Sequence, residues 1–178
     1  MTRVQGILVR IVAFGIVPLV TAAWSHRPTQ RAAPTTYSSS QYGYSISYPA
    51  DWIRTAVSNE DLNEVSPERD AFLAVGTIGL PRPLTPAEMN KMMSDQLVEL
   101  GASPAAIKSS MGMIHGSLFY VQQAVVNGNG AKMNDIFLET QRQGRLYAFN
   151  GGWAPGTPQA ALEQAQIEAG FGSITFAE

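Results

Sequence analysis

Alternating large and small side chains mark the first strand of the chain, between residues 42 and 49. The large side chains at every second position are Tyr42, Tyr44, Ile46 and Tyr48. This period of two is typical of a strand with one packed face and one solvent-facing face. Pro49 cannot donate a backbone hydrogen bond to a sheet, and Asp51 favours a tight corner. The pattern therefore predicts a strand that stops at Pro49 and a chain that turns Trp52 back toward the core.

Five further segments have strand-like composition. They span residues 53–57, 71–78, 118–126, 131–141 and 145–150. Residues 127–130 read Asn-Gly-Asn-Gly, and Gln143-Gly144 separates the last two segments, so both turns contain residues that tolerate positive φ. The last three segments therefore predict an antiparallel meander. Residues 59–70 are polar and acidic, and we expect them to form a connection.

A capping box begins the first predicted helix. Thr85 is the N-cap, Pro86 occupies the first helical position, and Glu88 lies three residues past the cap. The apolar residues at spacings of three and four are Met89, Met92, Met93, Leu97 and Leu100. They form one apolar stripe, and Gly101 is suited to a left-handed C-terminal cap. These signals predict a helix over residues 85–100.

A second threonine and proline pair, Thr157-Pro158, predicts another helix from residue 158 to about residue 169. The residues expected to be buried on this helix and just after it are Leu162, Ala165, Ala169, Phe171, Ile174 and Phe176. Strands, a helix, more strands and a helix follow one another in the chain. This order predicts an α+β fold in which helices flank an antiparallel β-sheet.

The block from residue 42 to residue 52, Tyr-Gly-Tyr-Ser-Ile-Ser-Tyr-Pro-Ala-Asp-Trp, resembles the opening of the PsbP-like family. Weaker matches follow in the same order: a turn at residues 128–130, strands at residues 132–139 and 146–149, and a final helix that ends near Phe171. The resemblance covers most of the chain after its leader. It implies an α/β/α sandwich of the PsbP-like type, in an exported, non-photosynthetic member of bacterial type.

The functions known in the PsbP-like family are binding functions. PsbP itself assists the oxygen-evolving centre of photosystem II and has been linked to manganese and calcium, and a yeast relative binds a small GTPase. The resemblance therefore implies a binding or assembly module. Neither of these partners is carried over to this chain.

The first residues have the features of an export signal. Arg3 and Arg10 precede an apolar run over residues 11–24, which is shorter than the about 20 residues that a bilayer-spanning helix needs. Small residues allow cleavage after Ala23 or Ser25, and retention of the segment is the alternative. We predict a signal peptide at residues 1–25, a flexible leader at residues 26–40 and one domain at residues 41–178. The protein would then be periplasmic or extracellular and would touch a membrane only through this transient segment.

Composition and charge exclude several classes of function. Without the four arginines of the leader, the chain keeps 8 of its 12 basic side chains against 14 acidic ones, a formal charge of −6. Such a charge disfavours binding to nucleic acid. The chain has no cysteine, which removes disulfides, thiol catalysis and thiolate metal sites. Its content of hydrophobic residues, 45%, is that of an ordinary folded domain.

Candidate catalytic residues are few. His115 is the one histidine after the leader, and Ser110 and Ser117 lie near it in the sequence. No Gly-x-Ser-x-Gly motif surrounds either serine, and no motif assigns an acid to the histidine. A zinc site would lack both cysteines and a second histidine. We therefore predict a protein without catalytic residues, and a serine-type hydrolase around His115 is the alternative.

Two features of the sequence could bind a ligand. Five carboxylates within eleven residues could hold calcium or manganese through oxygen ligands: Glu60, Asp61, Glu64, Glu68 and Asp70. A solvated acidic loop is the alternative, and no cofactor is predicted. Trp153 follows two glycines, so its ring could dock a protein partner or could pack against the last helix.

These observations together predict an exported binding or accessory protein without catalytic activity. Its partner would be a protein of the cell envelope or a small ligand. Besides the hydrolase, one more alternative is open: a carrier of a small apolar ligand, which requires a cavity between the sheet and a helix.

Overall fold

A seven-stranded antiparallel sheet forms the centre of the computed structural model, which describes residues 33–58, 60–128 and 131–177. Its strands, in sheet order, are β3 (Ile53–Arg54), β4 (Leu62–Val65), β5 (Ala71–Gly79), β9 (Arg145–Trp153), β8 (Ala131–Arg142), β7 (Ser117–Gly128) and β6 (Lys108–Ile114). The predicted signal peptide and the first part of the predicted leader lie outside the described residues. None of the helices in the described part of the chain is long and apolar enough to cross a membrane.

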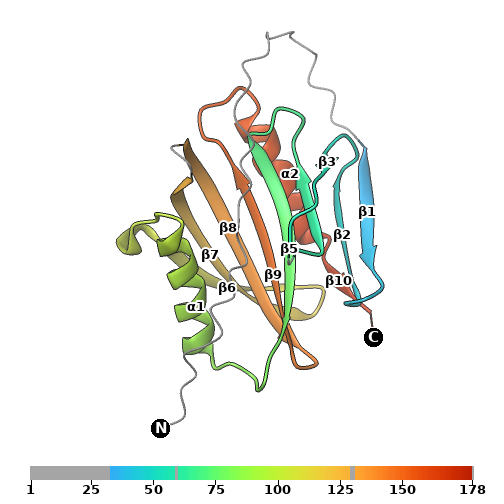
Figure 1. Ribbon diagram of the computed structural model, residues 1–178, viewed down its shortest axis with the longest axis vertical. Coiled ribbons are helices and arrows are strands. Elements are labelled where there is room, and N and C mark those ends of the chain that lie inside the picture. The colour runs from blue at the N-terminus through green and yellow to red at the C-terminus, as the bar shows by residue number, and fades with distance from the viewer. Residues whose placement is uncertain (1–32, 59, 129–130, 178) are drawn as a thin grey trace.

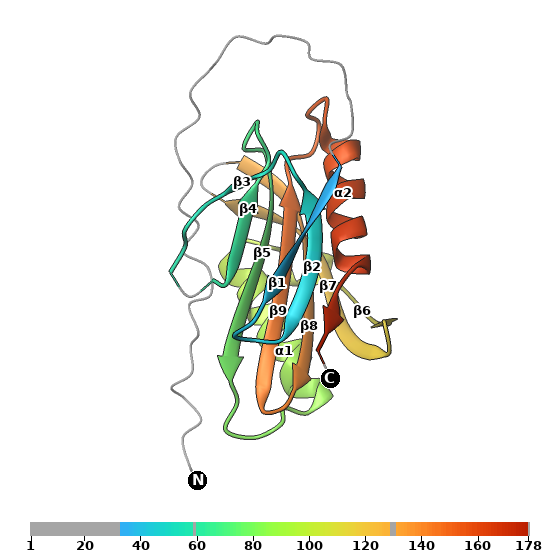
Figure 2. The ribbon, with the colours of Figure 1, turned by 90° about the vertical axis from the view of Figure 1, so that its right-hand side faces the viewer.

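Helices and a small sheet cover the two faces of the large sheet. Helix α1 (Pro86–Glu99) lies on one face, and helix α2 (Ala160–Gly172) lies on the other (Figures 1 and 2). A three-stranded antiparallel sheet shares the α2 side and contains β1 (Pro34–Ser39), β2 (Tyr44–Pro49) and β10 (Thr175–Phe176). A short 3-10 helix, Pro104–Ala106, precedes β6. The predicted α+β fold, an antiparallel sheet flanked by helices, is confirmed.

Helix α1 forms as its sequence predicts. The hydroxyl of Thr85 accepts a hydrogen bond from the backbone N–H of Glu88, and the Glu88 carboxylate accepts one from the Thr85 N–H in return. Met89, Met93 and Leu97 are fully buried against the sheet. Gly101 ends the helix with φ +87°, the left-handed conformation that glycine adopts without strain.

Helix α2 begins later than predicted and buries a different face. It starts at Ala160, and the Thr157 hydroxyl donates to the carbonyl of Ala154 at 3.4 Å instead of capping the helix. Ala165 and Ala169 are exposed and Leu162 is half-buried, so the predicted buried face is wrong. The residues that α2 buries are Glu163, Gln166, Ile167, Gly170 and Phe171. Phe171 and Ile174 are buried and Phe176 packs on the same core, as predicted.

Glycines explain why α2 turns this face to the sheet. A Cβ added at Gly151 of β9 would overlap with the side chains of Ile167 and Phe171. A Cβ added at Gly170 would lie 2.9 Å from the Ser47 carbonyl oxygen of β2. Both positions admit only a hydrogen atom, so the helix approaches the two sheets closely. The space between the large sheet and α2 is therefore filled at this point, and the cavity required of an apolar-ligand carrier is not found there.

Four strands in the described part of the chain were not predicted, and one of them is the two-residue β10 at an edge of the small sheet. Residues 34–39 fall in the predicted flexible leader, yet β1 pairs along its whole length with β2. Residues 62–65 fall in the predicted acidic connection, yet β4 pairs with β5 and buries Leu62 and Glu64. Strand β6 forms an edge of the large sheet and is mostly exposed. Each of these strands is polar or lies at an edge, so none has the alternation of apolar residues on which the prediction depends.

The face of the sheet under α1 contains two buried carboxyl groups on β8. Asp135 and Glu139 are 2% and 0% exposed, and neither carboxylate has a hydrogen-bond partner among the described residues. Burial raises the pKa of Asp135 well above its ordinary value and raises the pKa of Glu139 to about 8. The folded state therefore holds Glu139 in the protonated, uncharged form near neutral pH, and burial favours the protonated form of Asp135 as well.

Replacing Gly151 with alanine is expected to lower the free energy of unfolding by about 1–3 kcal/mol, because the new methyl group overlaps with Ile167 and Phe171. The matched control is Gly112→Ala on β6, where a Cβ would meet no atom within 4 Å. Urea unfolding of the two variants measures the difference. Equal stability of both variants would contradict the close packing of α2 on β9.

The stability of the protein is expected to fall as the pH rises from about 5 to about 8. Glu139 has a pKa of about 8 in the folded protein and about 4.3 in an unfolded chain, so the folded state binds more protons across this interval. Glu139→Gln removes the part of this loss that comes from Glu139 and should be more stable than the wild type at pH 9 by about 2–4 kcal/mol. Thermal unfolding from pH 5 to 9 tests this, with the exposed Glu99→Gln as a control. A wild type with constant stability over this range would contradict the prediction.

Candidate functional site

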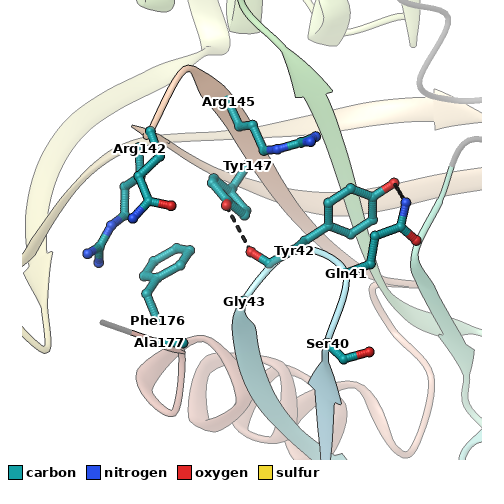
Figure 3. Close-up of a pocket in the computed structure, with 10 residues that line it drawn as sticks. Ser40, Gln41, Tyr42, Gly43, Arg142, Arg145, Tyr147, Phe176 and Ala177 are labelled. Carbon is teal, nitrogen blue, oxygen red and sulfur yellow. Dashed lines mark hydrogen bonds between the residues drawn. The ribbon is translucent and has the colours of Figure 1, made fainter.

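A cleft of about 240 Å³ opens at the end of the large sheet where β8 and β9 join. The loop over residues 40–43, between β1 and β2, forms one wall (Figure 3). Arg142, Gln143 and Arg145 of the β8–β9 turn form the opposite wall, with Tyr147 of β9 and Phe176 of β10 between them. Segments far apart in the sequence therefore meet in one cleft, which we call the arginine–aromatic cleft.

The β8–β9 turn determines where the two arginines lie. Arg142 and Arg145 are paired directly opposite each other, with only Gln143 and Gly144 between them. Both turn residues have positive φ, +48° and +72°, which is the signature of a type I′ hairpin turn. Directly opposite residues of an antiparallel pair project from the same face of a sheet. The turn therefore directs both guanidinium groups toward the side of β1, β2 and β10.

Each arginine stacks on an aromatic ring of the cleft. The guanidinium carbon of Arg142 lies 4.7 Å from the centre of the Phe176 ring, and that of Arg145 lies 5.3 Å from the centre of the Tyr42 ring. Arg142 also donates a hydrogen bond to the Ser117 hydroxyl at 3.0 Å. Such stacking fixes the direction of a guanidinium group and leaves its edge available for hydrogen bonds.

Hydrogen bonds hold the opposite wall of the cleft in place. The Tyr147 hydroxyl donates to the backbone carbonyl of Tyr42 at 2.9 Å (Figure 3). The Gln41 side-chain amide donates to the Tyr42 hydroxyl at 3.0 Å. The N–H of Ala177 donates to the carbonyl of Gly43 at 2.8 Å. The walls are therefore connected to each other and to β10, so the cleft is a built feature of the fold.

The charge of the cleft is opposite to that of the chain as a whole. None of the described residues that line it is acidic, and neither salt bridge among the described residues involves Arg142 or Arg145. Two like charges directly opposite in a sheet are unfavourable. An anionic ligand would relieve this repulsion, because arginine binds carboxylate and phosphate groups through paired N–H donors.

The candidate hydrolase residues do not come together. The His115 ring nitrogen Nε2 lies 3.1 Å from the carbonyl oxygen of Gly172, and the side chain is exposed. The Ser117 hydroxyl bonds to Arg142, and Ser110 is exposed on β6. No hydrogen bond joins the histidine to either serine within the described part of the chain. The geometry therefore gives no serine nucleophile that His115 could activate.

The five predicted carboxylates separate into different environments. Glu60 accepts a hydrogen bond from the Asn63 amide, and burial raises its pKa. Asp61 accepts one from the Tyr44 hydroxyl at 2.7 Å. Glu64 is 1% exposed because it lies on the buried face of β4, and burial raises its pKa. The structure therefore does not bring these five carboxylates together around one point, and only Glu68 and Asp70 of them lie close to each other in a carboxylate cluster.

Glu68 and Asp70 instead meet a third carboxylate that the sequence analysis did not select. They lie in the loop before β5, and their carboxylate oxygens lie within 4.8 Å of those of Glu163 on α2. Glu163 was missed because a glutamate on a helix normally faces solvent. Its burial becomes visible only when the buried face of α2 is known.

Trp153 is buried rather than presented to a partner. It is 7% exposed and belongs to the core between β9 and α2. Its backbone pairs with Ala71 of β5 and Asn134 of β8. The buried position of Trp153 therefore agrees with packing against the last helix and not with docking a protein partner.

A second hollow is more apolar and lies beside α2. It is an open groove of about 540 Å³ between α2 and strands β1 and β2, lined in part by Tyr48, Pro49 and Ala169. It lies on the surface, outside the core between α2 and the large sheet. The residues before Ala33 lie outside the described ranges.

Solved structures with the same arrangement of strands and helices are known. The solution structure of cyanobacterial PsbP (CyanoP) from Synechocystis sp. PCC 6803 superposes with a TM-score of 0.62 at 18% identity, over 86% of this chain and 98% of that one. LpqN, described as involved in cell envelope biogenesis of Mycobacterium tuberculosis, gives a TM-score of 0.57 at 13% identity, over 82% and 91%. A point mutant of the protein Mog1 gives 0.56 at 9% identity, over 82% and 97%.

The chain has the Mog1/PsbP-like fold. The likeness extends over nearly the full length of each of these proteins, so the fold that the Tyr42–Trp52 block predicts is confirmed. No protein-family model and no curated protein matches the chain. At these identities the likeness concerns the fold alone, and the residues of the arginine–aromatic cleft have to be interpreted from their own geometry.

We expect His115→Ala to leave any ester or peptide hydrolysis by the purified protein unchanged, because the ring contacts a backbone carbonyl and neither serine. A panel of generic ester and peptide substrates measures this, with Ser117→Ala as a second variant. Loss of a measurable activity in both variants would support the hydrolase alternative instead.

Proposed function

We propose that this protein is an exported, non-catalytic binding or accessory protein that recognises an acidic segment of a protein partner through the arginine–aromatic cleft. The observation that supports this most directly is the pair Arg142 and Arg145, two like charges placed opposite each other with no acidic residue among the described residues that line the cleft. Such a pair costs stability, and binding of an anionic group offsets that cost.

The shape of the cleft favours a peptide over a free ion. Aromatic rings of Tyr42, Tyr147 and Phe176 lie beside the two guanidinium groups (Figure 3). Arginine and aromatic side chains together are enriched where protein surfaces bind each other tightly. A carboxylate would bind the arginines, while the neighbouring residues of the same segment would cover the half-buried rings of Tyr42 and Phe176. The rest of the protein is acidic and would repel an acidic partner. Such a partner would therefore bind at the cleft in preference to other parts of the surface.

Export is part of the proposal. The basic and apolar residues before position 25 support a signal peptide, and the related fold of LpqN belongs to a protein involved in cell envelope biogenesis. We infer that the partner is a protein of the cell envelope or the extracellular space.

The groove beside α2 favours the alternative function, carriage of a small apolar ligand. Its lining includes Pro34, Tyr48, Pro49 and Ala169. It is open to solvent, whereas carriers of apolar ligands bury most of the ligand surface. The cleft therefore supports the proposed function better than the groove supports the alternative.

Removing both cleft charges is expected to weaken partner binding about 10- to 100-fold, because two charge-assisted hydrogen bonds are lost. The test variant is Arg142→Gln with Arg145→Gln in the full chain, expressed in its own host. The protein and its crosslinked partner are captured with an antibody, because Ala177 lines the cleft and a tag attached near it would interfere with binding. The partner found with the wild type is then titrated against the purified variants.

The matched control is Lys108→Gln with Lys132→Gln, which removes the same charge from exposed strand positions outside the cleft. It should bind the partner as the wild type does. Equal weakening in both double variants would indicate general electrostatic attraction, and unchanged binding in the arginine variant would place the interface elsewhere. Either result would contradict the proposed role of the cleft.

A further inference from the structure

Glu163 is a buried acid without a partner. It lies in the first turn of α2 and is 3% exposed, and neither of its carboxylate oxygens has a hydrogen-bond partner among the described residues. Burying a carboxyl group without compensation is costly, and an unsatisfied buried group in a native fold calls for an explanation such as a bound ion.

The surroundings of Glu163 provide two further carboxylates. The loop between β4 and β5 carries Glu68, which is exposed, and Asp70, which is half-buried. One carboxylate oxygen from each of the three residues lies within 4.8 Å of the others. Calcium binds oxygen at about 2.3–2.6 Å, so two oxygens on one ion lie at most about 5 Å apart. Small rotations of the three side chains would therefore bring one oxygen of each onto a single calcium ion.

We propose that Glu68, Asp70 and Glu163 form a binding site for a hard divalent cation, calcium or manganese. All three donors are carboxylate oxygens, which such cations prefer, and no histidine takes part. Neither salt bridge among the described residues involves these acids, so their negative charge is not neutralised by a basic side chain. Exposed Glu68 leaves the site open on one side, where water would complete the coordination.

The loop that carries Glu68 and Asp70 is held in place by Ser66. The Ser66 hydroxyl donates to the Asp70 carboxylate at 3.0 Å and accepts from the N–H of Ala71 at 3.1 Å. The N–H of Ala154 donates to the Asp70 carbonyl at 2.7 Å. These bonds attach the loop to the start of β5 and the end of β9, and they place it beside the first turn of α2.

A proton is the competing occupant of this site. Burial and the nearby Asp70 carboxylate raise the pKa of Glu163 to about 8, so without a cation the group is protonated at neutral pH. A protonated Glu163 explains how the buried acid is tolerated. In that form Glu163 can donate a hydrogen bond to the Asp70 carboxylate, but Asp70 and Glu68 then remain two neighbouring carboxylates without a salt bridge among the described residues.

The test is calorimetric titration of the EDTA-treated, dialysed full chain with calcium chloride and, separately, with manganese chloride. We expect one saturable site in the wild type and at least tenfold weaker binding in Glu163→Gln and in Asp70→Asn. The cation should also raise the melting temperature of the wild type and not that of Glu163→Gln. Glu163→Gln should fold, because the amide removes a buried ionisable group.

Two controls separate this site from general attraction to an acidic protein. Glu168→Gln changes an exposed carboxylate on the same helix, and Glu60→Gln changes one in the acidic segment outside the three-carboxylate cluster. Both should bind the cation as the wild type does. Absence of saturable binding up to about 1 mM, the weak end for extracellular calcium modules, would overturn the proposal and leave the proton as the occupant. Equal weakening in the control variants would overturn it as well.

Discussion

The close approach of α2 to β9 and β2 is the contact on which both proposed sites depend. Gly151 and Gly170 leave no room for a Cβ between the helix and the two sheets, so the helix can lie in only one position along its axis. Its first turn then places Glu163 beside the loop before β5. Its last turn leads through Ser173 into β10, which carries Phe176 into the arginine–aromatic cleft. A shift of α2 would therefore alter both sites together.

The two sites lie at opposite ends of the large sheet and have opposite charge. Strand β9 runs from Arg145, in the cleft, to Trp153, opposite Ala71 beside the acidic loop. Eight residues of extended strand separate these ends by about 26 Å. Helix α2 runs along β9, so its two ends lie apart in the same direction as the two ends of that strand (Figure 2).

The sequence predicts those parts of the fold whose signals are local. The capping box at Thr85 and the turn at Gln143-Gly144 each form as predicted, because their bonds lie within a few residues. The strands β1 and β4 were missed, since their pairing is with distant residues and their buried faces carry polar groups such as Glu64. The arginine pair could have been predicted: a two-residue turn between Arg142 and Arg145 already places them opposite each other. The role of Glu163 could not have been predicted, because its burial depends on the glycines that allow α2 to approach the sheet.

Buried acids serve different purposes in different parts of this structure. Asp135 and Glu139 lie four residues apart on one face of β8, which separates them by about 13 Å. No single ion can bind both, and burial favours the protonated form of each, so Glu139 is expected to cost stability as the pH rises through about 8. Glu163 has the same kind of burial, but carboxylate oxygens of Asp70 and Glu68 lie within 4.8 Å of its own, and Glu68 is exposed to solvent. Burial alone therefore does not indicate a cation site; burial together with converging oxygens and an opening to water does.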